Sequence, residues 1–187
     1  MKILRHQDYR RMPWKNGMGT TEEVMAYPPD SDISSFGWRL SIAHVGADGP
    51  FSVFAGIDRT IALLDGDGLM LDLPDRTIEL SPQGEPFAFS GDLQISSRNR
   101  GGPTIDLNIM TRRGQFTHEM QRLADIAFDA TAEITVFMFN TPCVIALDGE
   151  KIGMQRFDAL IVEGNGGPSV HIQGGPIDLL RVTISRQ

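Results

Sequence analysis

The sequence predicts an all-β protein, and three observations lead to this prediction. The 187-residue chain contains 20 glycines and 11 prolines, an excess of turn formers that is typical of a chain with many short strands. Its clearest hydrophobic period is two residues, the period of a strand with one buried face, in Trp38–Ala43 and again in Ile105–Ile109. Apolar residues make up 41 % of the chain, which is sufficient for a sizeable core.

The two alternating segments also predict which polar side chains face together. Arg39 and Ser41 share a face opposite Trp38, and Asp106 and Asn108 share a face in the second segment. Apolar runs bounded by turn residues predict further strands, in chain order, at Thr60–Leu64, Leu69–Leu73, Arg76–Leu80, Phe87–Phe89, Ile134–Asn140, Val144–Leu147, Lys151–Met154, Ala159–Val162, Ser169–Ile172 and Ile177–Ser185.

A weak internal repeat predicts a two-part architecture. Leu71–Ile78 leads through a turn to Phe87–Gly91, and Ala146–Ile152 leads in the same way to Leu160–Gly164. Each copy contains a strand, a tight turn, a short strand and an apolar strand closed by glycine. Two such modules are expected in two packed β-sandwiches or in a pair of jelly-roll barrels, although two generic hairpins would give the same pattern.

No low-complexity linker separates the two copies, so we expect residues 1–187 to form one compact unit. The expected modules are residues 1–115 and 116–187, with an exchange of terminal strands between them left open. Phe116–Ala130, at the start of the second module, is the stretch with the most helical character, and an irregular connection is the alternative.

The charge balance limits the class of partner. The chain has 17 Lys and Arg against 24 Asp and Glu, for a formal net charge of −7. Nucleic acids and anionic membranes require a basic face, so neither is expected as a partner. Met1–Arg11 lacks the apolar core of a signal peptide, and no window approaches the roughly 18 apolar residues of a membrane span. We therefore expect a cytoplasmic protein, with formation of a homodimer left open.

Metal and nucleophilic chemistry find little support in the sequence. His6, His44, His118 and His171 are far apart and form none of the usual ligand spacings, so we expect no metal and no other cofactor. Cys143 lies in an apolar run, where a buried inert thiol is more common than a nucleophile. The chain has no Gly-x-Ser-x-Gly elbow, and we assign no catalytic residue.

Two arginines of the N-terminal half stand at unusual positions. Arg39 lies mid-strand between large apolar residues, an unfavourable place for a guanidinium unless it is paired or lines a cavity. Arg59 directly precedes the apolar run Thr60–Leu64. A structural salt bridge, for example between Arg59 and Asp58, is the alternative to a functional role.

Two further segments carry polar groups suited to ligand binding. In the glycine-rich segment that contains Lys15 and Asn16, the backbone allows close approach, and these side chains add a charge and an amide. An ordinary solvated turn is the alternative there. In the segment that begins with Asp106 and Asn108, the adjacent Arg112 and Arg113 point opposite ways in an extended chain, so at most one of them faces a cavity.

Taken together, these segments resemble the HutD/Ves family, cupin-like proteins associated with bacterial histidine utilisation. The matching pieces occur in order and extend over nearly the whole chain. They are Pro13-Trp14-Lys15-Asn16-Gly17-x-Gly19-x-Thr21-x-Glu23, Trp38-Arg39-Leu40-Ser41-Ile42-Ala43, Gly49-Pro50-Phe51-Ser52-x-Phe54-x-Gly56-Ile57-Asp58-Arg59 and Asp106-x-Asn108-x-Met110-x-Arg112-Arg113-Gly114. Met18 stands where the family often has a glycine, and His44 where a carboxylate is common.

The resemblance implies a bicupin, two double-stranded β-helix modules in one chain, which agrees with the internal repeat. It also implies a protein without established catalysis that binds a small acidic metabolite such as N-formylglutamate and restrains flux through histidine breakdown. Cupins of this family lack the usual metal-binding histidines, and so does this sequence.

We therefore expect a metal-free protein that binds a small anionic metabolite, formylglutamate-like or formate-like, in its N-terminal module. Arginine suits carboxylates because its planar fork makes two parallel charge-assisted hydrogen bonds. An isomerase or hydrolase that uses Lys15, Asp106 or His44 as acid or base is the alternative; a metal-dependent cupin enzyme and a protein-interaction module are less favoured. The expected ligand-binding residues are Lys15, Asn16, Arg39, Ser41, Arg59, Asp106, Asn108 and Arg112.

Overall fold

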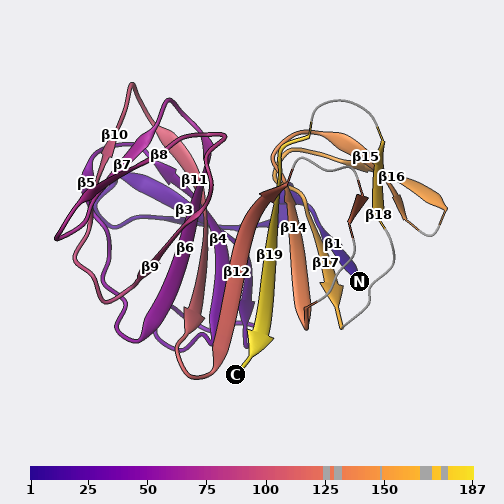
Figure 1. Cartoon of the computed structure of the whole chain (residues 1–187), viewed down its shortest axis with the longest axis horizontal. Coiled ribbons are helices and arrows are strands. Elements are labelled where there is room, and N and C mark those ends of the chain that lie inside the picture. Colours follow the sequence, from indigo (N-terminus) through magenta and orange to yellow (C-terminus); the bar gives the residue numbers. More distant parts are fainter. Residues whose placement is uncertain (124–126, 129–131, 148, 165–169, 174–176) are drawn as a thin grey trace. The chain divides into compact units, whose positions relative to one another are not determined.

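The computed structural model confirms an all-β chain. It describes residues 1–123, 127–128, 132–147, 149–164, 170–173 and 177–187. In these ranges the strands, β1 to β19, are joined by turns and by a 3₁₀ turn at His6–Asp8, and no helix is long and apolar enough to cross a membrane. The chain divides into two compact units, an N-terminal unit of Arg10–Thr117 and a C-terminal unit of Met1–Tyr9 with His118–Gln187 (Figure 1).

The N-terminal unit consists of two antiparallel sheets. The larger sheet has the spatial order β2 (Arg10–Pro13), β3 (Gly19–Tyr27), β4 (Trp38–Val45), β11 (Thr104–Arg112), β6 (Ile57–Asp65) and β9 (Phe87–Ser90). The smaller sheet has the order β5 (Gly49–Pro50), β10 (Ser96–Asn99), β7 (Leu69–Asp72) and β8 (Thr77–Leu80).

Side chains from both sheets fill the interior of this unit. Leu69, Leu71 and Leu80 of the smaller sheet pack in one cluster with Ile61 and Leu63 of β6, and all five are almost fully buried. The face of the larger sheet that carries Ile61 and Leu63 is therefore the one that faces the smaller sheet. We call it the inner face.

Strand register identifies the other side chains on the inner face, because residues directly opposite each other on paired strands share a face. Asn108 is in register with Ile61 and with Ser41, and Asp106 with Leu63 and Ala43. The expectation that Asp106 and Asn108 face together, and likewise Arg39 and Ser41, is confirmed. The inner face thus comprises Thr21 and Glu23 of β3, Arg39, Ser41 and Ala43 of β4, Asp106, Asn108 and Met110 of β11, Arg59, Ile61 and Leu63 of β6, and Phe87 and Phe89 of β9.

Many of the buried side chains on the opposite face of the larger sheet are apolar. Leu40, Ile42, Leu107 and Ile109 are fully buried there. Trp38, also fully buried, stacks on a tyrosine of β3, with ring centroids 6.2 Å apart. The central strands are therefore buried on both faces, and polar side chains at their centre need partners inside the protein.

The C-terminal unit also has two sheets with a core between them. Its core includes Phe137, Phe139, Leu160, Ile172 and Leu179. The first sheet has the order β1 (Lys2–Leu4), β17 (Ala159–Glu163), β14 (Ile134–Phe139), β19 (Leu179–Arg186) and β12 (Phe116–Leu123), and the second β13 (Ala127–Phe128), β18 (Val170–Gln173), β15 (Cys143–Leu147) and β16 (Glu150–Met154).

Met1–Tyr9 joins the C-terminal unit by specific contacts. The strand β1 pairs with β17. Arg5 Nη1 lies 2.6 Å from Asp158 Oδ2, and the Tyr9 hydroxyl donates to the Phe157 carbonyl at 2.8 Å. The first residues of the chain therefore close an edge of the sheet formed by its last third.

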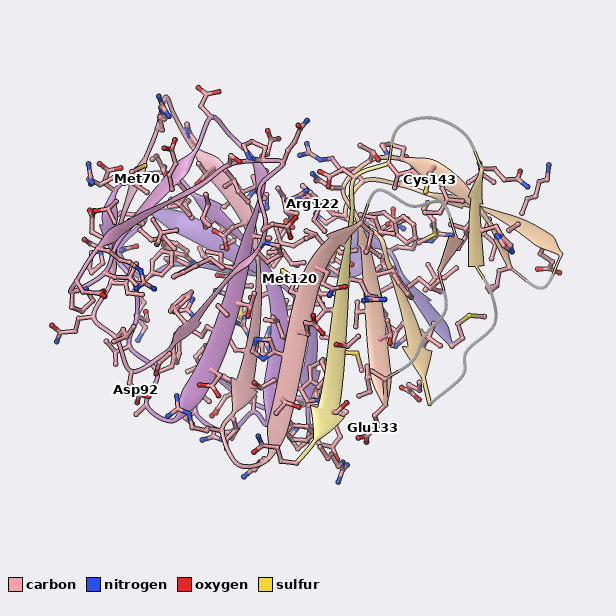
Figure 2. The ribbon with its side chains drawn as sticks, viewed as in Figure 1. Met70, Asp92, Met120, Arg122, Glu133 and Cys143 are labelled. Atoms are coloured by element: carbon pink, nitrogen blue, oxygen red, sulfur yellow. The ribbon has the colours of Figure 1, made fainter. Side chains whose placement is uncertain are left out.

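The helical character expected for Phe116–Ala130 is wrong at Phe116–Leu123, and so is the alternative of an irregular connection there, because these residues form β12 beside β19. Phe116 and Met120, both buried, are four residues apart. This spacing puts two side chains on one side of a helix and also on one side of a strand, so it does not distinguish the two (Figure 2 labels Met120). Pairing with β19 decides for the strand. Residues 124–126 and 129–130 of that stretch, and Ser169 of another expected strand, lie outside the described residues.

Candidate functional site

A polar cluster lies on the inner face of the N-terminal unit. Met110 of β11 is in register with Arg39 of β4 on one side and with Arg59 of β6 on the other. The two arginines therefore project toward the same interior from either side of β11. Each is only 7 % exposed. The structure thus brings together the two cations at unusual sequence positions.

Asp106 and Asn108 continue the cluster along β11. Asn108 and Asp106 occupy the next two inward positions from Met110, at about 7 Å and 13 Å respectively along a strand of this type. Asn108 is in register with the buried Ser41. Most of the side chains predicted to bind a ligand therefore share one buried face.

Arg39 is neutralised by a carboxylate of the next strand. Its Nε donates to Glu23 Oε2 at 2.8 Å, and its Nη1 lies 3.5 Å from Ser41 Oγ. Glu23 is in register with Ser41, whereas the adjacent Glu22 is in register with Ile42 and faces the other way. Alternation along β3 therefore gives Arg39 a partly buried ion-pair partner.

Arg59 has aromatic neighbours instead. Its guanidinium carbon lies 5.3 Å, 5.4 Å and 4.9 Å from the ring centroids of Phe51, Phe54 and Phe89, a cation–π arrangement. Its Nη1 donates to the Ser52 carbonyl at 3.4 Å. Among the residues that the structure describes, no carboxylate oxygen lies within ion-pair distance of Arg59.

Burial shifts the titration of Arg59 and Asp106 in opposite senses. Desolvation lowers the pKa of Arg59 to about 10; attraction to Asp106 opposes this shift, and repulsion by Arg39 adds to it. Arg59 therefore still carries its charge at neutral pH. Desolvation raises the pKa of Asp106 to about 7, against the attraction of Arg59. Near pH 7, Asp106 is divided between its protonated and ionised forms.

Three atoms of the cluster are buried without a hydrogen-bond partner. They are Arg59 Nε, Asp106 Oδ2 and Asn108 Oδ1. Buried polar atoms are normally satisfied by protein, water or ligand. A donor and two acceptors on one inner face therefore mark a place suited to a small polar ligand.

Trp14 lies over the inner face at the start of β3. Its indole Nε1 donates to Thr21 Oγ1 at 2.8 Å. A Cβ on Gly19 would lie 2.9 Å from the Trp14 ring and 2.5 Å from the His44 carbonyl oxygen. The spacing Gly19-x-Thr21-x-Glu23 thus provides, at three inward positions, space for the indole, its acceptor and the partner of Arg39.

Lys15 and Asn16 are not brought to the cluster. Both are exposed in the turn between β2 and β3, and Asn16 Oδ1 accepts a hydrogen bond from the Met18 amide at 3.0 Å. Because β3 pairs with β4 so that Gly19 lies near Val45, this turn lies beyond the end of β3 that is remote from Arg39.

Arg112 also has a role elsewhere. Its Nε and Nη2 donate to the carbonyls of Phe36 and Ser34 at 3.1 Å and 3.0 Å, which ties the β3–β4 connection to β11. The neighbouring Arg113 pairs with Asp58 at 2.6 Å on the surface. Neither guanidinium contributes to the inward-facing cluster.

Glu23, Trp14 and the three phenylalanines around Arg59 are site residues that sequence reasoning did not assign. Trp14 and Glu23 belong to the glycine-rich motif, but their roles depend on the alternation of β3, which has few inward apolar residues to reveal it. Phe51 and Phe54 lie in the connection that leads into β6, in the same motif as Arg59, whereas Phe89 comes from β9. The spacing of these residues along the chain does not show that their rings converge on Arg59.

Comparisons with known proteins identify the family of this chain. The HutD family model matches residues 6–177. The chain belongs to the HutD family. A relative from Pseudomonas putida, an uncharacterised 21.2 kDa protein in the hutC 3′ region, is 33 % identical over 168 residues and aligns over 88 % of each chain. Protein Ves from Citrobacter koseri is 37 % identical over 129 residues, which cover 67 % of this chain and 66 % of the relative.

Solved structures support the same assignment. HutD from Pseudomonas fluorescens SBW25, described as a formate condition, has 34 % identity and a TM-score of 0.84, and the match covers all of this chain and 98 % of that one. A cupin 2 conserved barrel domain protein from Leptotrichia buccalis has a TM-score of 0.61 at 8 % identity, over 94 % of this chain and 96 % of that one. The latter likeness shows the cupin fold alone.

This HutD-family protein also has an open cleft, separate from the cluster, of about 590 Å³ lined by residues that include Met18, Thr20 and His44. His44 Nε2 lies 3.3 Å from Glu22 Oε2, without the angles of a hydrogen bond, and Arg11 Nε lies 2.7 Å from Glu22 Oε1. Because Glu22 is already paired with a cation, this cleft lacks the unpaired buried charge that distinguishes the inner face.

The C-terminal unit has a polar cluster of its own, but the groups of this cluster are paired or hydrogen-bonded with one another. Arg122 (labelled in Figure 2) pairs with Asp178. Asn140 Nδ2 donates to Asp178 Oδ2 at 2.6 Å, and Arg156 Nε donates to Asn140 Oδ1 at 3.2 Å. Within the described ranges of the HutD-family chain, no group of three or more His, Cys, Asp or Glu side chains is arranged to hold a metal ion.

Proposed function

We propose that this HutD-family protein binds a small carboxylate in the interior of its N-terminal unit and that Arg59 holds it. The supporting observation is a buried guanidinium with no carboxylate partner among the described residues. A buried charge requires a compensating charge or strong hydrogen bonds. Arg39 has Glu23, whereas Arg59 has aromatic faces and one long hydrogen bond. An anionic ligand supplies what Arg59 lacks.

The charge of the cluster favours one carboxylate group at this position. Arg39 and Glu23 neutralise each other. With Asp106 partly ionised at pH 7, the cluster carries a net charge between zero and +1. One ligand carboxylate neutralises this charge, and a second would find no free cation inside the cluster. Arg39 is already paired with Glu23 and has no charge left for a second carboxylate. A dicarboxylate ligand therefore has its second carboxylate outside this cluster.

The names of two relatives support the ligand class and its metabolic setting. One relative is named for the hutC 3′ region, and the solved HutD of Pseudomonas fluorescens is described as a formate condition. We take the ligand to be formate-like or formylglutamate-like, and its binding to modulate histidine catabolism without turnover.

Calorimetric titration tests this function. Formate, N-formylglutamate, glutamate and urocanate are titrated into the wild type, Arg59→Gln and Arg76→Gln. Arg76 is an exposed arginine of the same unit that pairs with the exposed Asp75, so it controls for loss of one positive charge. We expect Arg59→Gln to weaken binding at least about tenfold, as loss of a charge-assisted hydrogen bond does, and Arg76→Gln to leave it unchanged. No heat from any compound, or undiminished binding by Arg59→Gln, would contradict the proposal.

Asp106 supports a second candidate, an isomerase or hydrolase on the same scaffold. A buried carboxyl with a pKa of about 7 has the titration behaviour of a general acid or base at neutral pH. This candidate predicts turnover of a histidine-pathway intermediate that Asp106→Asn abolishes while binding persists. Binding without turnover favours the non-catalytic function.

A further inference from the structure

The surroundings of the Asp106 carboxyl define how it can meet a ligand. The residue is 1 % exposed, and its Oδ2 has no hydrogen-bond partner. Its neighbours in register on the inner face are Ala43 and Leu63, which offer no polar atom from their side chains. The smaller sheet contributes leucines to the same interior. A ligand in this interior thus meets Asp106 directly.

The charged groups on the surrounding strands are few. Glu23 of β3 and Arg39 of β4 are paired with each other. Arg10 of β2 is in register with Glu23 but is exposed at the sheet edge, and Arg112 of β11 is bound to backbone carbonyls. Arg59 of β6 is therefore the charge available to both Asp106 and an incoming anion.

We propose that Asp106 binds the ligand in its protonated form, donating its proton to a carboxylate oxygen of the ligand that Arg59 also contacts, so that binding takes up a proton. This inference rests on the proposed function and names the regulation of that site by pH. No covalent bond changes. The proton comes from solvent for every molecule whose Asp106 is ionised before binding, and it is released when the ligand leaves.

The physical reason is repulsion between carboxylates in a medium of low polarity. Two carboxylates that share a buried site beside one guanidinium cannot both stay ionised, and they share a proton instead. Burial already raises the pKa of Asp106 to about 7 in the free protein. The ligand carboxylate, ionised throughout the neutral range, raises it further.

The expected result is a defined pH dependence. Above the pKa of free Asp106, the affinity for N-formylglutamate falls with each rise in pH, so binding is roughly tenfold weaker at pH 8 than at pH 6. Titration calorimetry in two buffers of different ionisation enthalpy measures the protons taken up, and we expect nearly one per ligand at pH 8 and close to none at pH 6.

Asp106→Asn is the decisive variant because the amide keeps the donor and the shape but cannot titrate. It should bind N-formylglutamate with an affinity that is the same at pH 6 and pH 8, without proton uptake. A carbon-13 NMR titration of the wild-type aspartate carboxyls provides a measurement that needs no variant, and we expect one buried carboxyl to be protonated by ligand addition at pH 8.

The outcomes separate this inference from the function beneath it. Binding with no proton uptake at pH 8, a tenfold loss that persists in Asp106→Asn, or no carboxyl that becomes protonated would overturn the inference and leave the carboxylate site standing. Absence of binding at both pH values would overturn the proposed function and the inference with it.

Discussion

Arg39 and Arg59 lie on either side of Met110 and face the same interior, but only Arg39 is paired with a carboxylate. The strand beyond each arginine makes the difference. Beyond β4, the strand β3 brings Glu23 to the inner face, whereas beyond β6 the strand β9 places Phe89 in register with Arg59. One guanidinium is therefore neutralised within the fold, and the other has no carboxylate partner among the described residues.

The Glu23–Arg39 pair predicts an asymmetric mutational response. Arg39→Met leaves Glu23 with its charge uncompensated in a mostly buried site, so we expect the free energy of unfolding to fall by about 3 kcal/mol. The double variant Glu23→Gln/Arg39→Met should recover a large part of this loss, because no lone charge remains. Urea unfolding followed by circular dichroism measures both, with Arg76→Met as the surface control. A double variant as unstable as the sum of the two single variants would contradict the pairing.

We predict that a side chain added at Gly19 clashes with its surroundings, whereas one added at Gly153 does not. A Cβ at Gly19 would lie 2.5 Å from the His44 carbonyl oxygen and 2.9 Å from the Trp14 ring, whereas a Cβ at Gly153 would meet nothing within 4 Å. We expect Gly19→Ala to lower the free energy of unfolding by about 1–3 kcal/mol and to shift the fluorescence of Trp14. Gly153→Ala should change neither quantity appreciably. Equal stability of the two variants would show that the indole does not lie over Gly19.

We predict that protonated Asp106 contributes to the free energy of unfolding and that this contribution is lost as the pH rises. Its pKa is raised from 3.8 to about 7 in the folded protein, so the folded state holds this proton more tightly than the unfolded state. The associated stabilisation is complete below pH 4 and decreases through pH 7, by up to about 4 kcal/mol. The unfolding free energy of the wild type should therefore fall relative to that of Asp106→Asn between pH 4 and pH 7.

The range from pH 4 to pH 7 distinguishes the stability contribution of Asp106 from those of the surface carboxylates. Hydrogen bonds lower the pKa values of Asp32, Asp72 and Asp92 to about 2, so their contributions are present above pH 4 and disappear only in stronger acid. Urea titrations at pH 4, 5.5 and 7 make the comparison. A constant difference between wild type and Asp106→Asn across these values would show that Asp106 titrates normally.

We predict that Asp92 (labelled in Figure 2) holds in place the loop that covers Arg59. Its Oδ1 accepts a hydrogen bond from the Gly56 amide at 3.0 Å, and its Oδ2 pairs with Arg113 at 3.1 Å. The loop of residues 51–56 carries two of the rings around Arg59. We expect Asp92→Ala to increase amide hydrogen exchange in this loop and to speed ligand dissociation. Asp75→Ala, which removes another exposed ion pair, is the control and should leave exchange in the loop unchanged.

The strands with clear alternation were predictable because burial on one face imposes a period of two on the side chains. Trp38–Val45 and Thr104–Arg112 show this period, and with it the common face of Arg39 with Ser41 and of Asp106 with Asn108. β3 escaped prediction for the opposite reason. Its inward positions are glycine, threonine and glutamate, and a bulge between Glu23 and Met25 interrupts the period.

What the sequence by itself determined was the all-β class, the faces of the central strands, the family motifs and the presence of cations where burial is unfavourable. Only the tertiary structure decided which of the two buried arginines has a carboxylate partner among the described residues. Alternation assigns a side chain to a face, but the partner of a buried charge comes from the neighbouring strand, and alternation within one strand does not show which residue lies beside it. Glu23 on the strand beside Arg39, and Phe89 on the strand beside Arg59, are products of that pairing.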